Sequence, residues 1–250
     1  LVVTSSIPES ASVLALSGIE LVTTSGTNND TLTLTGAFTG GTIDLGLGTD
    51  ALNLANATNV VFVTGVETIT GGTGDDAITL SAAGTVTANL GLGTDILTLG
   101  AAGTSSLTLS GVETLVGSSG NDTVTFTSVQ SGISVDLGGG TADTLTLTAG
   151  ANSLAFSGVE RVQLGVSTGN DTLTLTGSSS GGTIDLGTGT ADILALAAGD
   201  YSFAVSGVES ITGTSGAENL SLTMGYTGTI NLGTGTDTLT VTGTNSLNLS

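Results

Sequence analysis

The chain alternates hydrophobic and polar residues over short runs, and glycine-rich stretches separate these runs. The runs "TLTLT" (31–35) and "TVTFT" (123–127) put Leu, Val or Phe at every second position, with Thr between them. Because the side chains of a strand alternate between its two faces, this period of two predicts short strands with one apolar face and one hydroxyl face. A helical interpretation fails, since Gly and β-branched Thr dominate and no stripe with a period of 3.6 residues occurs.

The strand pattern itself recurs with a period of about 47 residues. The string Ser/Thr-Gly-Val/Ile-Glu occurs five times, and its glycines are Gly18, Gly65, Gly111, Gly158 and Gly207. Each repeat also holds two turns that end in an acid and lead into alternating residues, as in "TGDDAITLS" and "NLGLGTDILTL". Self-similarity at such a period is typical of solenoid proteins, in which each repeat stacks on the next.

We therefore predict an all-β fold, a right-handed parallel β-solenoid or β-roll built from five repeats of about 47 residues. One coil for each acid-ended turn gives about ten coils. Residues 1–250 are predicted to form a single repeat domain, because no linker or change in composition interrupts the pattern. The chain starts and stops within the pattern, so further repeats, a cap or a neighbouring subunit is expected to cover its ends.

The composition excludes several classes of function. The chain has 250 residues and a formal net charge of −20, with 21 Asp and Glu, no His, no Cys, and Arg161 as its one cation. Without a basic patch, neither nucleic acid binding nor attraction to anionic membranes is expected. Without His or Cys there is no imidazole or thiolate metal site and no Ser-His or Cys-His nucleophile. No run of 18 apolar residues occurs, so membrane insertion is not expected.

The acid-ended turns are the candidate metal sites. Residues 71–79, "GGTGDDAIT", follow the pattern Gly-Gly-x-Gly-x-Asp-x-apolar-x, the nonapeptide that binds calcium in parallel β-rolls. Ca²⁺ takes six to eight oxygen ligands, and glycines let a turn direct several carbonyls at one point while the Asp supplies charge. The predicted metal-site residues are Asp30, Asp50, Gly71, Gly72, Gly74, Asp76, Gly91, Gly93, Asp95, Asp122, Asp143, Asp171, Asp192, Glu218, Gly233, Gly235 and Asp237.

The turns match this nonapeptide to different degrees. Only residues 71–79 fill every position. An extra Ala precedes Asp143 and Asp192 and is expected to displace their carboxylates, Glu218 replaces Asp in another turn, and Asn replaces a Gly before Asp30. An alternative without metal stays open, in which the turns cap strands through Asx hydrogen bonds. Charge favours calcium, since ten neighbouring carboxylates with almost no cation would repel one another.

Two further series recur once per repeat. The first is expected to consist of outward strand residues or secondary ligands: Asp44, Asn89, Asp136, Asp185 and Asn231. The second is expected at corners, where its members accept backbone N–H bonds or bind a lateral ion: Glu20, Glu67, Glu113, Glu160 and Glu209.

On the nonapeptide, the "GxGTD" turns and the recurring "SGVE", the chain resembles the repeat-in-toxin (hemolysin-type calcium-binding) family, in particular its surface-layer proteins and adhesins. This resemblance implies type I secretion, folding outside the cell in calcium, and assembly into a lattice or filament. The plain β-roll of that family has glycine turns on both edges. Here the alternate edge reads "SAAG" (81–84), so calcium is expected along one edge only.

The leading hypothesis is therefore a non-enzymatic, extracellular, calcium-stiffened solenoid of a bacterial surface layer, sheath, filament or adhesin stalk. Its expected partners are Ca²⁺ and further copies of itself. A solenoid that binds ice or another ligand through its Thr-x-Thr arrays is the alternative, although these arrays are interrupted. No enzyme is expected, because polysaccharide-cleaving sites on β-helices usually need a cation or an aromatic platform, and the chain offers only Arg161 and no Trp.

Overall fold

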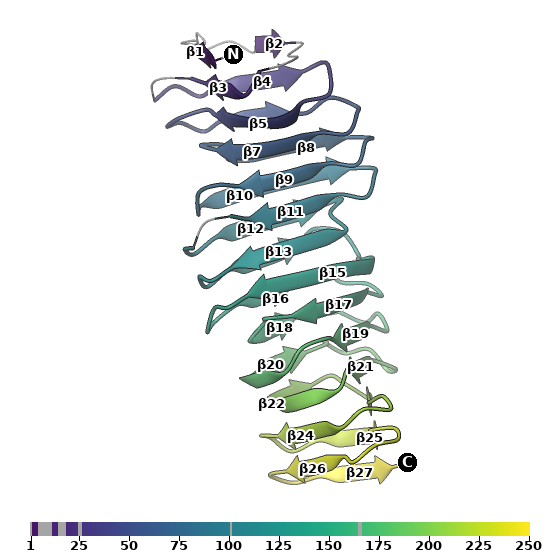
Figure 1. Cartoon of the computed structure of the whole chain (residues 1–250). Helices are drawn as coiled ribbons and strands as arrows, with labels where there is room; N and C mark the ends of the chain where they lie inside the picture. Colours follow the sequence, from purple (N-terminus) through teal and green to yellow (C-terminus); the bar gives the residue numbers. More distant parts are fainter. Residues whose placement is uncertain (1, 5–11, 15–18, 25–26, 101, 165–166) are drawn as a thin grey trace. The chain divides into compact units, whose positions relative to one another are not determined.

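The computed structural model describes residues 2–4, 12–14, 19–24, 27–100, 102–164 and 167–250, and the elements in these ranges are β-strands (Figure 1). The chain forms two compact units, residues 1–122 and 123–250. In each unit successive strands alternate between two parallel sheets, which we call the odd sheet and the even sheet after the numbers of their strands. This is a parallel β-solenoid, as predicted. Among the described residues no helix is long and apolar enough to cross a membrane.

The strands of the first unit stack in chain order within each sheet. Its odd sheet contains β1 (Val2–Thr4), β3 (Leu21–Thr23), β5 (Thr39–Asp44), β7 (Val60–Thr64), β9 (Ala77–Leu80), β11 (Ile96–Leu99) and β13 (Thr114–Ser118). Its even sheet contains β2 (Ser12–Leu14), β4 (Thr31–Leu34), β6 (Ala51–Asn53), β8 (Thr68–Gly72), β10 (Thr85–Gly91) and β12 (Ser106–Ser110).

The second unit has the same organisation. Its odd sheet contains β15 (Ser131–Gly138), β17 (Ser153–Ser157), β19 (Thr172–Leu175), β21 (Ile193–Leu196), β23 (Ser210–Thr212), β25 (Thr227–Asn231) and β27 (Ser246–Leu249). Its even sheet contains β14 (Thr123–Phe126), β16 (Thr144–Thr146), β18 (Arg161–Gln163), β20 (Ser179–Asp185), β22 (Gly199–Ser206), β24 (Glu218–Leu222) and β26 (Thr238–Val241).

One coil is shorter than the sequence pattern suggests. Ala51 pairs with Thr68, so that coil takes 17 residues, while Arg161 pairs with Thr183 and that coil takes 22. Counted over all of its strands, the chain has about 12 coils, so the predicted number of about ten coils is corrected. The prediction counted one coil for each acid-ended turn, but other coils start without such a turn, and a repeat of about 47 residues spans about two and a half coils.

Because of this half coil, equivalent residues of successive repeats alternate between the two sheets. Gly65 lies before β8 of the even sheet and Gly111 lies before β13 of the odd sheet. Gly158 and Gly207 repeat the alternation before β18 and β23. Gly18 lies outside the described residues. Two repeats, or about five coils, bring a motif back to the same sheet.

The core of each unit lies between its two sheets. Ile78, Leu97 and Leu115 are register neighbours on β9, β11 and β13, and their side chains are 0–1% exposed. Full burial of such a side chain contributes about 1.5–3 kcal/mol, so these columns stabilise the stacking of the coils. The residues between them, such as Thr79 and Thr98, point outward.

The glycine of the Ser-Gly-Val-Glu string is required by the backbone. Gly111 has a φ of 60°, and a Cβ on it would lie 2.5 Å from the backbone nitrogen of Gly91, whose own φ is 95°. A left-handed conformation costs an L-residue about 1–2 kcal/mol. The same stacked pair recurs as Gly65 on Gly46, Gly158 on Gly138 and Gly207 on Gly187. This contact explains why the two glycine motifs recur at a fixed distance from each other.

The glycine pair gives a stability prediction. We expect Gly111→Ala to lower the free energy of unfolding by about 2 kcal/mol or more, because it adds left-handed strain to a backbone clash. Gly84→Ala is the control, since a Cβ there meets no atom within 4 Å and φ is not in the left-handed range. Urea unfolding of both variants in calcium measures the difference. Equal midpoints for the two variants would contradict the packing argument.

Candidate metal centres

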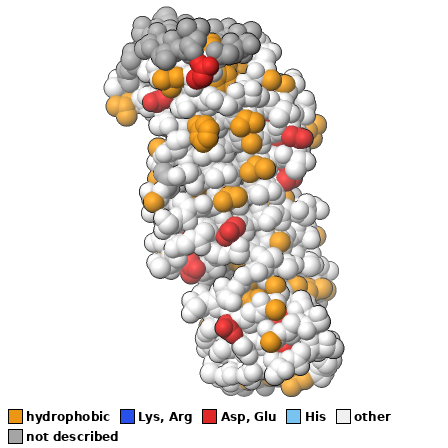
Figure 2. Space-filling view, in the orientation of Figure 1, with side chains coloured by type: hydrophobic (Ala, Val, Ile, Leu, Met, Phe, Trp, Pro, Cys, Tyr) orange, Lys and Arg blue, Asp and Glu red, His pale blue; other side chains and the backbone are white. Residues whose placement is uncertain are grey.

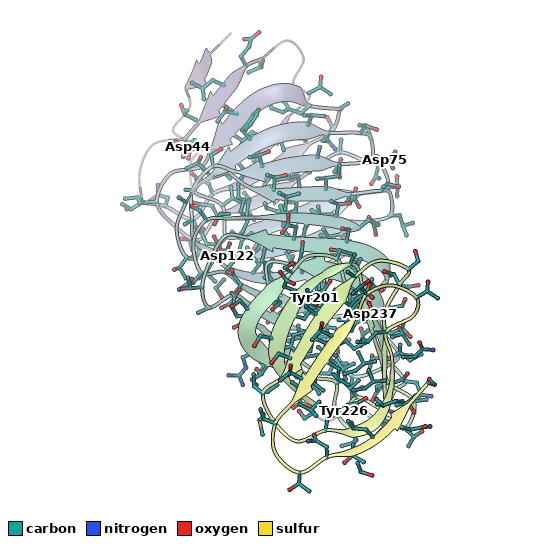
Figure 3. All side chains as sticks on the ribbon, turned by 60° about the horizontal axis from the view of Figure 1, so that its bottom comes forward. Asp44, Asp75, Asp122, Tyr201, Tyr226 and Asp237 are labelled. Atoms are coloured by element: carbon teal, nitrogen blue, oxygen red, sulfur yellow. The ribbon has the colours of Figure 1, made fainter. Side chains whose placement is uncertain are left out.

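The turn acids lie inside the turns. Asp76 is 1% exposed and Asp95 is 0% exposed, although both are charged residues of glycine-rich turns. Each stands directly before a strand, so its side chain points inward like the apolar residue two places later. Asp75, by contrast, is exposed at the rim of the first unit (Figure 3). The buried acids of the predicted set are Asp30, Asp50, Asp76, Asp95, Asp122, Asp143, Asp171, Asp192 and Glu218, and Asp237 is half-buried.

The acids do not follow one edge of the solenoid, as the sequence led us to expect. Asp30 and Asp50 precede the even strands β4 and β6, whereas Asp76 and Asp95 precede the odd strands β9 and β11. The half coil in each repeat explains the correction, since it moves the motif to the opposite edge. On each edge the acids form short runs over neighbouring coils: Asp30–Asp50–Glu67, Asp76–Asp95–Glu113, Asp143–Glu160, Asp171–Asp192–Glu209 and Glu218–Asp237.

Within a run, each carboxylate after the first accepts a hydrogen bond from the backbone amide of the acid before it. The amide of Asp76 donates to Oδ1 of Asp95 at 2.8 Å, and the amide of Asp95 donates to Oε2 of Glu113 at 2.7 Å. Glu67, Glu160 and Glu209 accept in the same way, at 2.7–2.8 Å. These members of the Glu series are therefore backbone acceptors, one of the two roles that the sequence allowed.

The other oxygen of most turn carboxylates has an unusual environment. In seven turn acids it is buried without a hydrogen-bond partner among the described residues: Asp30, Asp50, Asp76, Asp95, Asp171, Asp192 and Glu218. A buried oxygen of this kind is costly, and a proton or a cation stabilises it. Burial accordingly raises the pKa of the carboxyls of Asp50, Asp76 and Asp192, and it raises the pKa of Asp95 to about 6.

The coil that begins at Asn59 shows which contacts form when Asn occupies the position of a turn acid. Asn59 stands directly before β7, as Asp76 stands before β9. Its Nδ2 donates to the carbonyls of Ala55 at 3.1 Å and Ala57 at 2.7 Å. The same nitrogen donates to Oδ1 of Asp76 in the next coil at 2.8 Å. The niche is thus lined by two carbonyls of its own turn and by the next carboxylate, and the two hydrogens of the amide are shared among these three oxygens.

The second unit contains the same niche. Nδ2 of Asn152, directly before β17, donates to the carbonyls of Thr148 at 3.0 Å and Gly150 at 3.1 Å. It also donates to Oδ1 of Asp171 at 2.9 Å. The sequence analysis missed Asn59 and Asn152. Their spacing of 93 residues, about twice the motif period, is the signal that could have identified them.

Where Asp replaces Asn, a carboxylate oxygen takes the place of the amide donor. The residues four and two positions before Asp76 are Gly72 and Gly74, whose carbonyls correspond to those of Ala55 and Ala57. Both carbonyls face the next coil, because a Cβ on Gly91 would overlap the first and a Cβ on Gly93 would lie 2.5 Å from the second. Carbonyl and carboxylate oxygens are the ligands that Ca²⁺ prefers.

The donor set therefore fits a hard cation, with one restriction. Among the described residues no three acidic side chains gather into one metal cluster, so backbone carbonyls would have to supply much of the coordination. The predicted glycines lie where such carbonyls pass. A Cβ would overlap an atom of a neighbouring coil at each of Gly71, Gly72, Gly74, Gly91, Gly93, Gly233 and Gly235.

The irregular turns keep their carboxylates in place, so the expected displacement is wrong. Asp192 is fully buried, and the amide of Asp171 donates to its Oδ1 at 2.7 Å. The extra Ala lengthens only the turn, because the strand that follows Asp192 keeps its register with β19. Asp143 is also fully buried. Glu218, the first residue of β24, is held through Oε1 by the hydroxyl of Thr214 at 2.5 Å.

The strand-end series has a local role. Oδ1 of Asp44 accepts a hydrogen bond from the amide of Gly46 at 3.0 Å, which closes an Asx turn where the strand ends. Asp136, Asp185 and Asn231 accept from the amide two residues later in the same way, at 2.9–3.2 Å. These four are therefore turn residues at the outer surface, one of the two roles that the sequence allowed.

Comparison with known proteins identifies no relative. No protein-family model matches the chain, and no curated protein or solved structure matches it significantly.

The raised pKa values give a pH prediction for the metal-free protein. Between 3.8, the ordinary pKa of Asp95, and about 6, its value in the fold, the native state binds more protons than the unfolded state. Stability must therefore fall as pH rises through this window. We expect the melting temperature in chelator to be higher at pH 4 than at pH 7, and Asp95→Asn to reduce the slope. A melting temperature that rises over this window would refute the assignment.

Proposed function

We propose that the protein is a non-enzymatic structural solenoid that calcium stiffens outside the cell. The observation that carries this proposal is the pair of equivalent niches. Where Asn59 places an amide against three oxygens, Asp76 places a buried oxygen without a partner among the described residues. The chain has a net charge of −20 and Arg161 as its one cation, so it supplies almost no positive charge of its own.

In this proposal the ion lies in the niche and joins neighbouring coils. For the turn of Asp76, the candidate ligands are its free oxygen, the carbonyls of Gly72 and Gly74, and Asp95 of the next coil. When bound, the ion supplies positive charge that offsets the repulsion between stacked carboxylates. Corresponding niches belong to the other turn acids whose second oxygen is buried and has no hydrogen-bond partner in the part of the chain that the structure describes: Asp30, Asp50, Asp95, Asp171, Asp192 and Glu218.

The resemblance to repeat-in-toxin proteins supports an extracellular location. Sites that combine few carboxylates with many carbonyls suit the millimolar calcium found outside cells, since fewer charged ligands lower the affinity for calcium. A surface layer, sheath, filament or adhesin stalk, delivered by type I secretion, fits such an acidic solenoid of stacked coils.

Removal of calcium tests the proposal directly. We expect the melting temperature, followed by circular dichroism, to fall when EDTA is added and to recover when excess Ca²⁺ is restored. Equimolar Mg²⁺ is expected to restore less, because it demands octahedral geometry and keeps its waters. A melting temperature that is the same with EDTA and with calcium would rule out the calcium mechanism.

A hydrophobic patch on the odd sheet of the first unit supports self-association. The patch consists of Val60, Phe62, Ala77, Ile96 and Val116, on the neighbouring strands β7, β9, β11 and β13. Four of its side chains are 39–47% exposed. Figure 2 shows hydrophobic side chains gathered on this unit, among few and separate acids.

Charge indicates the partner that fits this patch. The outward positions of these four strands carry no acid, although the chain as a whole has a net charge of −20. Two copies of the chain can therefore meet here without direct contact between like charges. On the even sheet, the outward positions of β8 are polar, with Thr68 and Thr70 exposed. We propose a second copy of the chain as the occupant.

Variants of the patch test this contact. We expect Phe62→Thr with Ile96→Thr to weaken self-association in calcium at least about tenfold, because apolar burial drives such contacts. Val129→Thr with Met224→Thr is the control, since these side chains are also exposed but lie outside the patch. Sedimentation velocity over a concentration series measures the effect. An equal effect of both pairs, or a wild type that stays monomeric, would exclude the patch as the interface.

Binding of ice or another ordered ligand is the second candidate function. Register places Thr68, Thr87 and Thr108 in one column on the even sheet of the first unit. Such a column of hydroxyls is the feature that favours this function. However, Ala51 occupies the same column on the neighbouring strand β6 and interrupts it. We therefore rank this function second, and a thermal-hysteresis measurement distinguishes the two.

A further inference from the structure

Three asparagines occupy equivalent places on the odd sheet at a spacing of 93 residues. They are Asn59, Asn152 and Asn245, and each stands directly before an odd strand, β7, β17 or β27. Their Oδ1 atoms accept hydrogen bonds from the backbone of the preceding coil at 3.0, 3.0 and 2.9 Å. Oδ1 of the turn aspartates accepts the same bond. Asn and Asp therefore hold the backbone in the same way and differ only in the second atom.

The second terminal atom of the side chain is a nitrogen in Asn and an oxygen in Asp. This difference determines whether the niche needs a cation. In Asn59 that atom is the amide nitrogen Nδ2, which lies 2.7–3.1 Å from three oxygens. In Asp76 and Asp95, the next two residues on the same edge, it is a buried oxygen without a hydrogen-bond partner among the described residues. The amide is a donor without net charge, while the carboxylate adds a negative charge to a niche that is already lined by oxygens.

We propose that the side-chain amides of Asn59 and Asn152 take the place of the cation in their coils. This inference depends on the proposed calcium function and adds a second kind of coil to it. Once in about five coils, the odd edge has a niche that is satisfied by the chain alone. Each such niche directly precedes a run of aspartates, Asp76 in the first unit and Asp171 in the second.

The consequence is a metal-independent contact between two particular coils in each unit. The carboxylate of Asp76 accepts two hydrogen bonds from Asn59, one from its amide side chain at 2.8 Å and one from its backbone at 2.9 Å. Asp171 accepts the same two from Asn152, at 2.9 and 2.6 Å. The Oδ1 atoms of Asp76 and Asp171 thus join their coils to the preceding ones without a cation, whereas their second oxygens face the next coil and need one.

Counting the calcium ions bound to the full chain tests whether the two amides take the place of a cation. We expect Asn59→Asp and Asn152→Asp each to add one bound Ca²⁺ in equilibrium dialysis at millimolar calcium, and Asp76→Asn and Asp171→Asn each to remove one. Asn53→Asp is the control, because it adds the same charge on the outward face of β6, away from any niche. A wild type that binds no calcium would defeat the proposed function itself. A wild type that binds calcium, with an unchanged count in both Asn→Asp variants, would overturn only this inference.

Hydrogen exchange of the wild type in chelator gives a second test that needs no variant to fold. The amides of Ala77 and Thr172 donate to the backbone carbonyls of Asn59 and Asn152. The amides of Ile96 and Ile193 make the same bonds one coil later, to Asp76 and Asp171.

We expect the first pair to exchange at least about tenfold more slowly than the second when calcium is removed, since charge-assisted hydrogen bonds hold the first pair without metal. The difference is expected to shrink when calcium is added. Equal protection of both pairs in chelator, including complete loss of protection, would overturn the inference.

Discussion

The structure depends on one hydrogen bond that recurs between neighbouring coils. The backbone amide of the residue before a strand donates to a side-chain oxygen of the corresponding residue in the next coil, as Asp76 donates to Asp95 at 2.8 Å. Coils of 17 to 22 residues have turns of different lengths, so the turn backbone alone cannot supply an acceptor at a constant place. A short polar side chain that points inward can supply this acceptor. The resulting hydrogen bond fixes the register of each coil on the next.

This bond also creates the chemical problem of the fold. The side chain that accepts it brings a second polar atom into the same buried turn, where it must be satisfied as well. Asn59 does so with donors of its own, and Ser118 donates to the second oxygen of Asp122. Most of the other turn aspartates have a second oxygen that is buried without a hydrogen-bond partner among the described residues. The glycines, the burial of the acids and the proposed calcium niches are therefore consequences of a single structural requirement.

Much of this could be predicted from the sequence, because the signals are local. Alternation in "TLTLT" and the glycines around it identify the strands, and the acids before them identify the turns. The number of coils and the edge occupied by each acid could not be predicted, since no local signal marks the coils that begin at Asn59 or Gly84. The turn before Asp192 was misjudged because a turn absorbs one extra residue without shifting the strand. Whether a cation is present depends on contacts that only the folded chain defines.

The half coil in each repeat has a consequence for how such a chain can grow. Recombination between two adjacent repeats adds or deletes about 47 residues, which turns every later motif onto the opposite side of the solenoid. An apolar patch would then face away from the patches that precede it. Lengthening that preserves a continuous binding side must therefore proceed by pairs of repeats, and Asn59, Asn152 and Asn245 recur at this two-repeat spacing of 93 residues.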